Sequence, residues 1–265
     1  MTENSVSDPP AFTPFAANLL VGRHVFVTGA SSGLGRAAAV ALAGHGARVA
    51  ISGRDADRLE ETRARLPGDG HRAVVADFTD ADAAADLVKG VVKEGGPLDG
   101  VFHAAGVSMT LPVRLMKQDK IDAVFRPSVF GSFGIVRAAA QKNVMNDGGS
   151  IVLMSSISAN KGHTGMTAYS GAKAAVDGLV RSAAMEFAPR RIRINSIVAG
   201  AVYTEMYARE ADRMGAEWIA SVGAKHPLGF GATDDVSNAV AFLLSDAARW
   251  ITGTALVVDG GYMAQ

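Results

Sequence analysis

Short apolar runs alternate with longer amphipathic stretches along almost the whole chain. The short runs are rich in Val, Ile and Phe and end at glycine or polar residues, which is typical of buried β-strands. They occupy residues 24–28, 48–52, 72–76, 99–103, 150–154, 191–198 and 255–259. The longer stretches have apolar positions at helical spacing and occupy residues 34–46, 55–66, 80–93, 119–143, 167–188 and 233–245. Strands that alternate with helices predict an α/β fold, a single doubly wound domain whose sheet is mostly or wholly parallel.

Two segments depart from this pattern. Three prolines within the first 18 residues predict a flexible tail over residues 1–18. Residues 19–265 then form one domain, a length that a single α/β core allows. Residues 205–230 have the weakest periodicity, and we interpret them as a helical lid over the substrate.

Charge and composition exclude several classes of function. Lys plus Arg and Asp plus Glu number 26 each, so no net charge favours nucleic acid or an anionic membrane. The chain has no cysteine, which excludes disulfides, thiol catalysis and thiolate metal sites, and the six histidines show no ligand spacing, so we predict no metal. The first residues do not resemble a signal peptide, and no run approaches the roughly 20 apolar residues of a membrane span. We therefore expect a cytoplasmic protein whose partner is a small molecule.

The first predicted strand leads into TGASSGLG (28–35), which has three glycines between a strand and a helix. Gly29 permits a tight turn. Gly33 allows backbone N–H groups to approach a pyrophosphate at the positive end of the helix, and Gly35 allows close packing of helix on strand. Ser31 and Ser32 add hydroxyl donors. The loop predicts dinucleotide binding.

The spacing T-G-x-x-x-G-x-G resembles the short-chain dehydrogenase/reductase family in its classical type. The resemblance extends from about residue 22 to 262. It implies a single Rossmann domain without a separate substrate domain, an NAD(P)-dependent oxidoreductase, and assembly as a homotetramer or homodimer.

The end of the second predicted strand, ISGRD (51–55), faces the adenosine ribose in such folds. Gly53 stands where members that prefer NAD usually carry an acid, and Arg54 can pair with a 2′-phosphate. Arg36 can add to that charge. The sequence therefore favours NADP, with NAD as the alternative if Asp55 holds the ribose instead.

Other cofactor contacts are implied by the resemblance. Asp77 matches an aspartate that touches the adenine amino group, although an N-cap role is an alternative. The small residues of HAAG (103–106) let the backbone pass close to the ribose, and His103 is interpreted as structural. Val202 and Thr204 match positions that bind the nicotinamide carboxamide. The predicted cofactor-binding residues are Gly29, Ser31, Ser32, Gly33, Leu34, Gly35, Arg54, Asp77, Phe78, Ala104, Ala105, Gly106, Tyr169, Lys173, Val202 and Thr204.

The predicted reaction centre lies in TAYSGAK, where Tyr169 and Lys173 share one face of a helix. A cation near a phenol lowers its pKa, so Tyr169 can exchange a proton with a carbonyl or alcohol oxygen. Ser156 lies thirteen residues before Tyr169, the offset that the family gives to the serine that holds the substrate oxygen. Ser155 is the alternative by this count.

Two departures from the family pattern stand out. In FRPSVFG (125–131), Ser128 occupies the place of an asparagine whose carbonyl holds a water between the lysine and solvent. Pro127 lacks a backbone donor and should kink the helix there. Either Ser128 and a water rebuild the proton relay, which we favour, or proton exchange is slow. Ala199 replaces a proline before Gly200, which predicts a looser nicotinamide loop.

The sequence thus predicts hydride transfer between NADP(H) and a ketone or secondary alcohol, as in a 3-oxoacyl-type or other ketoreductase. Residues 158–166 and 205–228 are expected to cover the substrate. An NAD-linked alcohol or sugar dehydrogenase and enoyl reduction are the enzymatic alternatives. The alternative of another class is a non-catalytic nucleotide-binding scaffold or regulator, against which the intact serine, tyrosine and lysine argue.

Overall fold

The computed structural model describes residues 15–78, 80–205, 207–208 and 215–265. Within these residues the chain forms one seven-stranded sheet in the order β3-β2-β1-β4-β5-β6-β7, in which every neighbouring pair is parallel. The strands are β1 (His24–Thr28), β2 (Arg48–Gly53), β3 (Arg72–Val75), β4 (Leu98–His103), β5 (Met145–Ser156), β6 (Arg193–Ala199) and β7 (Ala255–Val258). The predicted doubly wound α/β fold is confirmed, and its sheet is wholly parallel.

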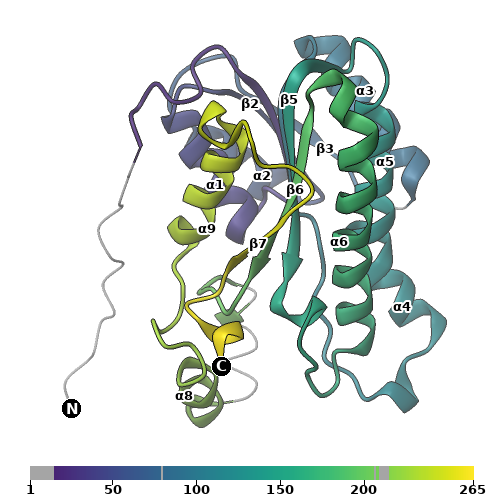
Figure 1. Cartoon of the computed structure of the whole chain (residues 1–265), viewed down its shortest axis with the longest axis vertical. Helices are drawn as coiled ribbons and strands as arrows, with labels where there is room; N and C mark the ends of the chain where they lie inside the picture. Colours follow the sequence, from purple (N-terminus) through teal and green to yellow (C-terminus); the bar gives the residue numbers. More distant parts are fainter. Residues whose placement is uncertain (1–14, 79, 206, 209–214) are drawn as a thin grey trace.

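Helices cover both faces of the sheet (Figure 1). The helices are α1 (Gly33–Gly44), α2 (Ala56–Ala64), α3 (Ala81–Gly95), α4 (Gln118–Phe125), α5 (Gly131–Ala139), α6 (Thr167–Phe187), α8 (Ala216–Gly223) and α9 (Thr233–Leu244). Short 3-10 turns lie at Val113–Leu115, Ile157–Ala159, Ala188–Arg190, Asp246–Ala248 and Tyr262–Ala264. Helices α1, α2 and α9 pack on one face around an apolar core, and α3, α5 and α6 pack on the other around a second core. The strands between the two cores are apolar on both sides, which explains their continuous hydrophobic runs.

The strand order reverses between β1 and β4, so consecutive crossovers leave this point in opposite directions. Thr28 at the end of β1 pairs in register with His103 at the end of β4. Doubly wound sheets have a crevice outside the carboxyl ends of their strands at such a reversal. The glycine loop and HAAG follow these two strands directly, so the fold brings both motifs to that crevice.

The helix predicted over residues 119–143 is divided by a π-helical turn, Arg126–Phe130, between α4 and α5. Gly131 N–H bonds to the Arg126 carbonyl, five residues back, instead of four. Pro127 has no N–H to continue the regular ladder, and π-turns accommodate such interruptions. The kink predicted at Pro127 therefore takes the form of a π-turn that carries Ser128.

The tail and the lid are only partly described. Phe15, near the end of the predicted tail, lies 6.0 Å from the ring of His45 between centroids and packs against the first apolar core. Residues 1–14 of the predicted tail and residues 206 and 209–214 of the predicted lid lie outside the described residues. Helix α8 forms the middle of the lid segment. None of the described helices is long and apolar enough to cross a membrane.

Candidate active site

The glycine loop brings β1, α1 and the HAAG segment into close contact. Gly29 has φ +67°, and a Cβ there would lie 2.7 Å from the Ala105 nitrogen. A Cβ on Gly35 would lie 2.3 Å from the Gly29 carbonyl oxygen, so any side chain would push α1 away from the loop. Neither position has room for a side chain, so both must be glycine. The tight turn and the close helix packing expected of them are present.

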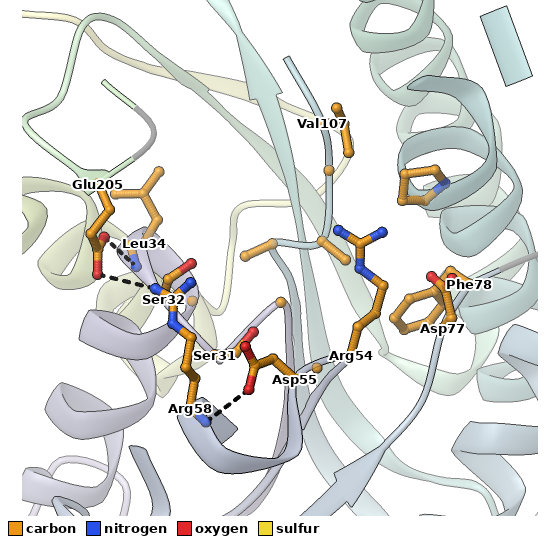
Figure 2. Close-up of a pocket in the computed structure, with 18 of the residues that line it drawn as sticks. Ser31, Ser32, Leu34, Arg54, Asp55, Arg58, Asp77, Phe78, Val107 and Glu205 are labelled. Carbon is orange, nitrogen blue, oxygen red and sulfur yellow. Dashed lines mark hydrogen bonds and ion pairs between the residues drawn. The ribbon is translucent and has the colours of Figure 1, made fainter. Parts of the chain in front are cut away.

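The loop forms one wall of a cavity of about 910 Å³ (Figure 2). The predicted cofactor residues that line it are Gly29, Ser31, Ser32, Gly33, Leu34, Gly35, Arg54, Asp77, Phe78, Ala104, Ala105, Gly106 and Thr204. Val202, Tyr169 and Lys173 do not belong to this lining. The cavity also has lining residues that the sequence analysis did not select as cofactor-binding, among them Gly53, Asp55, Arg58 and Glu205. Its size and shape suit an extended polar ligand laid along the ends of the strands.

Arg54, Asp55 and Arg58 follow the end of β2 and differ in their contacts. The Asp55 carboxylate accepts the Arg58 N–H at 3.0 Å and so caps α2. The exposed Arg54 side chain points into the cavity, and it has no hydrogen bond or ion pair with any residue that the structure describes (Figure 2). Arg58 supplies a second cation to the same wall.

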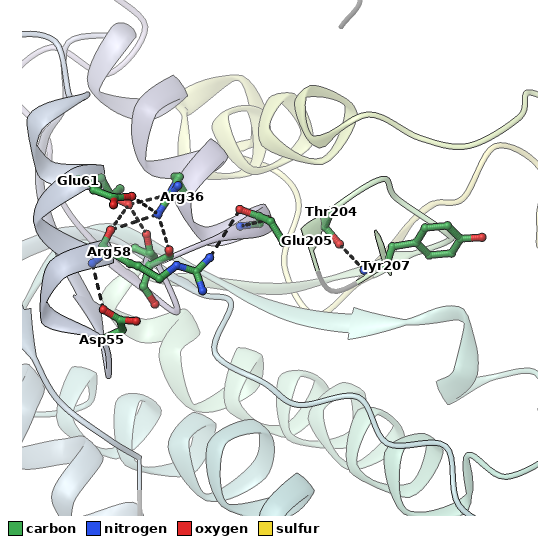
Figure 3. Close-up of polar contacts among 11 residues, drawn as sticks. Arg36, Asp55, Arg58, Glu61, Thr204, Glu205 and Tyr207 are labelled. Atoms are coloured by element: carbon green, nitrogen blue, oxygen red, sulfur yellow. Dashed lines mark hydrogen bonds and ion pairs between the residues drawn. The ribbon is translucent and has the colours of Figure 1, made fainter. Parts of the chain in front are cut away.

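Arg36 does not contribute to this wall. Its guanidinium donates to the Ser31 carbonyl at 2.6 Å and to the Thr62 hydroxyl at 2.9 Å, and it pairs with Glu61 at 3.5 Å (Figure 3). The Arg36 donors hold the glycine loop to α2 in this structure, and its expected contribution to a phosphate site stays a prediction.

Asp77 lies on the wall of the cavity opposite the glycine loop (Figure 2). The N-cap of α3 is Asp80, whose carboxylate accepts the Ala83 N–H at 2.8 Å. The alternative cap role of Asp77 is thus taken by Asp80. The Asp77 carboxylate stays at the cavity, where a base could meet it.

Tyr169, Lys173 and Ser156 come together at the ends of α6 and β5. The Lys173 Nζ lies 5.6 Å from the centroid of the Tyr169 ring and donates to the Met154 carbonyl at 2.8 Å. The Ser156 side chain hydrogen-bonds to the Tyr169 phenol. Ser155, the alternative serine, instead donates to the backbone carbonyl of Lys173 at 3.4 Å. The geometry therefore favours Ser156 as the serine of this cluster.

Burial sets the protonation of these groups. Desolvation raises the pKa of Tyr169, and the Ser156 hydrogen bond partly opposes it. Desolvation lowers the pKa of Lys173 to about 8, and the negative charge of Asp177 opposes that change. The phenol is therefore protonated at neutral pH and can donate a proton. Lys173 is not among the groups that shift the Tyr169 pKa here, so its expected effect on the phenol stays a prediction.

Asp177 was missed by the sequence analysis. It is buried one helical turn beyond Lys173, and its carboxylate accepts the Ser196 hydroxyl at 2.7 Å. The signal was available, because Lys173 and Asp177 are four residues apart in a helix and share a face. Its burial, which makes the charge matter, could not be read from the spacing.

Ser128 faces the same cluster from the π-turn. It is 1% exposed, and its Oγ has no hydrogen-bond partner among the described residues. A Cβ placed on Gly106 would lie 3.2 Å from Ser128 Oγ and 3.5 Å from Lys173 Nζ. Gly106 also lines the large cavity, so this edge of the cavity lies close to Ser128 and Lys173.

His103 joins β1, β4 and the π-turn. Its Nε2 lies 2.9 Å from the Pro127 carbonyl and its Nδ1 lies 2.7 Å from the Thr28 hydroxyl. A carbonyl only accepts, so Nε2 carries the proton and Nδ1 accepts from Thr28. Burial lowers the His103 pKa to about 3, which keeps this neutral form. The structural role predicted for His103 is confirmed.

The loop after β6 is held without the proline that the family usually has. The Ala201 N–H donates to His226 Nε2 at 3.0 Å, and the Gly200 N–H donates to the Val258 carbonyl at 3.0 Å. Val202 bridges to Gly231. These contacts hold the loop in this structure, and the looseness expected from Ala199 stays a prediction.

The segment expected to cover the substrate contacts the C-terminus. His163 lies 3.3 Å from the Ser158 hydroxyl and 2.9 Å from the Tyr262 hydroxyl. The Ser158 N–H donates to Ser156 Oγ at 3.2 Å. A chain of polar contacts therefore runs from Ser156 to the last residues of the protein.

Comparisons with known proteins agree with this geometry. The family model that matches residues 29–263 is described as enoyl-(acyl carrier protein) reductase. The chain is 39% identical over 249 residues to an L-rhamnose 1-dehydrogenase (NAD(P)(+)) from Sphingomonas sp. (strain SKA58), which covers 92% of this chain and 97% of that protein. It is 33% identical over 245 residues to a 3-oxoacyl-(acyl-carrier-protein) reductase from Staphylococcus aureus, with 90% and 97% covered. A solved structure of a putative short-chain alcohol dehydrogenase from Sinorhizobium meliloti 1021 superposes with a TM-score of 0.84 at 33% identity, over 94% of this chain and 100% of that chain.

Proposed function

The chain belongs to the short-chain dehydrogenase/reductase family of NAD(P)-dependent oxidoreductases, and we propose that it transfers a hydride between NADP(H) and a ketone or secondary alcohol. One observation carries this proposal. Gly106 lines the glycine-loop cavity and packs beside Lys173, since a Cβ on Gly106 would lie 3.5 Å from Lys173 Nζ. A dinucleotide that follows the cavity would therefore end beside Tyr169.

The residues present fit such a cofactor. The N-terminus of α1 and the hydroxyls of Ser31 and Ser32 offer donors for a pyrophosphate. Asp77 is free of the cap role and can accept from an adenine amino group. The cofactor supplies or accepts the hydride when it is bound.

The side chains of this protein handle the proton and the oxygen. Tyr169 donates its proton to the carbonyl oxygen in reduction and takes it back in oxidation. Ser156 holds the same oxygen by a hydrogen bond as negative charge develops on it. Lys173, held by the Met154 carbonyl, places a positive charge beside the phenol below about pH 8.

We favour NADP over NAD because of the wall at the end of β2. Arg54 points into the cavity and Arg58 adds a second positive charge. Asp55, the alternative partner of the ribose, uses its carboxylate to cap α2. A charged hydrogen bond from Arg54 contributes about 1.5–3 kcal/mol, which corresponds to roughly one to two decades of affinity.

We propose that Ser128 replaces the asparagine of the family's proton relay through a water. Ser128 Oγ and Lys173 Nζ lie on the same side of Gly106, since a Cβ there would be 3.2 Å from the first and 3.5 Å from the second. A buried hydroxyl without a protein partner is a place where an ordered water is expected. This arrangement would pass protons between Lys173 and solvent.

For the substrate, the first candidate is a ketone such as a 3-oxoacyl thioester, as the Staphylococcus relative's name indicates. The second is a sugar, which the 39% identity to the rhamnose dehydrogenase favours. The polar chain Ser158–His163–Tyr262 next to Ser156 suits a ligand with several hydroxyls.

A paired assay tests the proposal. Wild type is mixed with NADPH and acetoacetyl-CoA or other ketones, and separately with NADP⁺ and L-rhamnose, and absorbance at 340 nm is followed. The Tyr169→Phe variant serves as the matched control, because it keeps the ring and loses only the hydroxyl. We expect turnover by wild type with at least one substrate and a loss of about 100-fold or more in the variant. Equal rates for the two proteins would contradict the role of Tyr169.

We also propose assembly of identical subunits as a homotetramer or homodimer. Three apolar side chains on neighbouring elements are exposed: Phe130 just before α5, Phe133 on α5 and Met185 on α6. Exposed apolar surface of this kind supports burial against a second copy of the chain. The cytoplasmic location stays a prediction of the sequence.

A further inference from the structure

A carboxylate of the protein itself sits at the glycine loop. Glu205, at the start of the lid segment, accepts the Gly33 N–H at 2.9 Å through Oε2. Its Oε1 lies 3.8 Å from a guanidinium nitrogen of Arg58 (Figures 2 and 3). Glu205 thus joins the N-terminus of α1 to the arginine at the start of α2.

The proposed function assigns the same groups to the cofactor. Helix N-termini bind anions because their first N–H groups have no partner in the helix. The Gly33 N–H cannot serve both the Glu205 carboxylate and a pyrophosphate oxygen. The carboxylate and the phosphates also repel each other when both approach this positive site.

We propose that Glu205 is an internal competitor of the cofactor, whose carboxylate must leave Gly33 and Arg58 before the pyrophosphate can bind there. This inference rests on the proposed nucleotide site. It gives Glu205 a role in setting cofactor affinity, and it makes Arg58 available to phosphate only when Glu205 is displaced.

The surroundings of Glu205 allow this displacement. Its side chain is 45% exposed, and Thr204 and Glu205 border both the nucleotide cavity and a second cavity of about 930 Å³ beside α1 and α9. The carboxylate therefore has space on the side away from the loop. The Tyr207 N–H donates to Thr204 Oγ1 at 3.3 Å (Figure 3), which fixes the start of the turn that carries Glu205.

The link to Thr204 has a consequence for the site. Thr204 is, with Val202, one of the two residues predicted to bind the nicotinamide carboxamide, and it directly precedes Glu205 in the chain. Release of Glu205 from the loop would therefore act on the residue that orients the reactive ring. The cofactor phosphates would displace Glu205, and the nicotinamide would contact Thr204, the residue directly before it.

The test is a titration with NADPH, followed by nicotinamide fluorescence, of wild type, Glu205→Gln and Glu205→Ala. Gln keeps the size of Glu and removes the charge, and Ala removes the hydrogen bond as well. Glu217→Gln is the matched control, because Glu217 is an exposed carboxylate in the first turn of α8 and its loss changes the net charge equally.

We expect both Glu205 variants to bind NADPH about threefold to tenfold more tightly than wild type, because a partly exposed charged hydrogen bond no longer competes. Glu217→Gln should bind as wild type does. Equal or weaker binding by the Glu205 variants would overturn the inference alone. Failure of all four proteins to bind NADPH or NADH would overturn the proposed function, and this inference with it.

Discussion

Lys173 is a buried cation whose pKa burial lowers to about 8, while Asp177 one turn away opposes that change. Lys173 is charged below this pH and loses its proton as the pH rises through about 8. Activity that needs the charge should therefore decline on the alkaline side. Burial lowers the pH at which that decline lies, and the charge of Asp177 raises it.

Replacement of Asp177 by Asn tests this arrangement. Asn keeps the size of Asp and can still accept from Ser196, but the loss of the negative charge lowers the Lys173 pKa further. We expect the alkaline limb of the pH profile of kcat/KM to move to lower pH by roughly half a unit to one unit. The exposed Asp69→Asn is the control. An unchanged limb would mean that Lys173 does not govern it.

The proposed water beside Ser128 gives a second prediction at the same scale. Ser128→Ala removes the hydroxyl, and Gly106→Ala places a methyl group 3.2 Å from Ser128 Oγ and 3.5 Å from Lys173 Nζ, which crowds the two groups that the water would bridge. We expect both to lower kcat by about tenfold or more, since proton exchange through Lys173 is interrupted. Ser128→Ala should not lower the thermal stability, because Ser128 Oγ has no hydrogen bond to the described residues. Unchanged kcat and pH profile in Ser128→Ala would refute the relay.

Sequence spacing selected Ser156, Tyr169 and Lys173, and the fold brings these three together. The spacing did not reveal Arg58 or Glu205. Glu205 meets Gly33 across 172 positions of sequence, and such a contact depends on how α1 and the β6 loop pack. Local sequence patterns do not predict which residues so far apart in the chain come into contact.

At the scale of elements, the π-turn Arg126–Phe130 and His103 form one unit. His103 Nε2 donates to the Pro127 carbonyl, and this contact fixes the turn that presents Ser128. The ring must stay neutral to keep Nδ1 as an acceptor for Thr28.

This unit predicts a pH dependence of stability. Burial lowers the His103 pKa from 6.5 to about 3, so below pH 6.5 the unfolded chain binds a proton that the native protein does not. Stability is therefore lost as the pH falls, by about 1.4 kcal/mol per unit from this group. Denaturant unfolding of wild type and His103→Asn between pH 6.5 and 4.5 checks this. We expect a flatter slope in the variant, and parallel slopes would contradict the assignment.

The sequence predicted the strands well, and β1 has the predicted bounds, His24–Thr28, because fully buried parallel strands leave clear apolar runs. It predicted one helix where the structure has α4, a π-turn and α5. Pro127 signalled a disturbance, but its form depends on His103, which approaches from another strand. Tertiary contacts of this kind decide element boundaries beyond what periodicity can predict.

At the scale of the molecule, the cavity lies where the strand order reverses. The helices that cover the sheet leave some apolar side chains exposed. Phe133 on α5 is 51% exposed and Met185 on α6 is 74% exposed. If this face joins a second copy, Phe133→Glu should give smaller particles than wild type in light scattering after size exclusion. An unchanged mass would place the interface elsewhere, and a monomeric wild type would contradict the assembly.

The central claim is that the cavity along the glycine loop holds NADP(H) beside Tyr169. Its most direct test is a fluorescence titration of wild type and Arg54→Ala with NADPH and with NADH. The account predicts saturable binding, with NADPH preferred by about tenfold or more in wild type and the preference reduced in the variant. NADH binding that equals NADPH binding in wild type would contradict the choice of NADP. Absence of binding for both nucleotides would contradict the site itself.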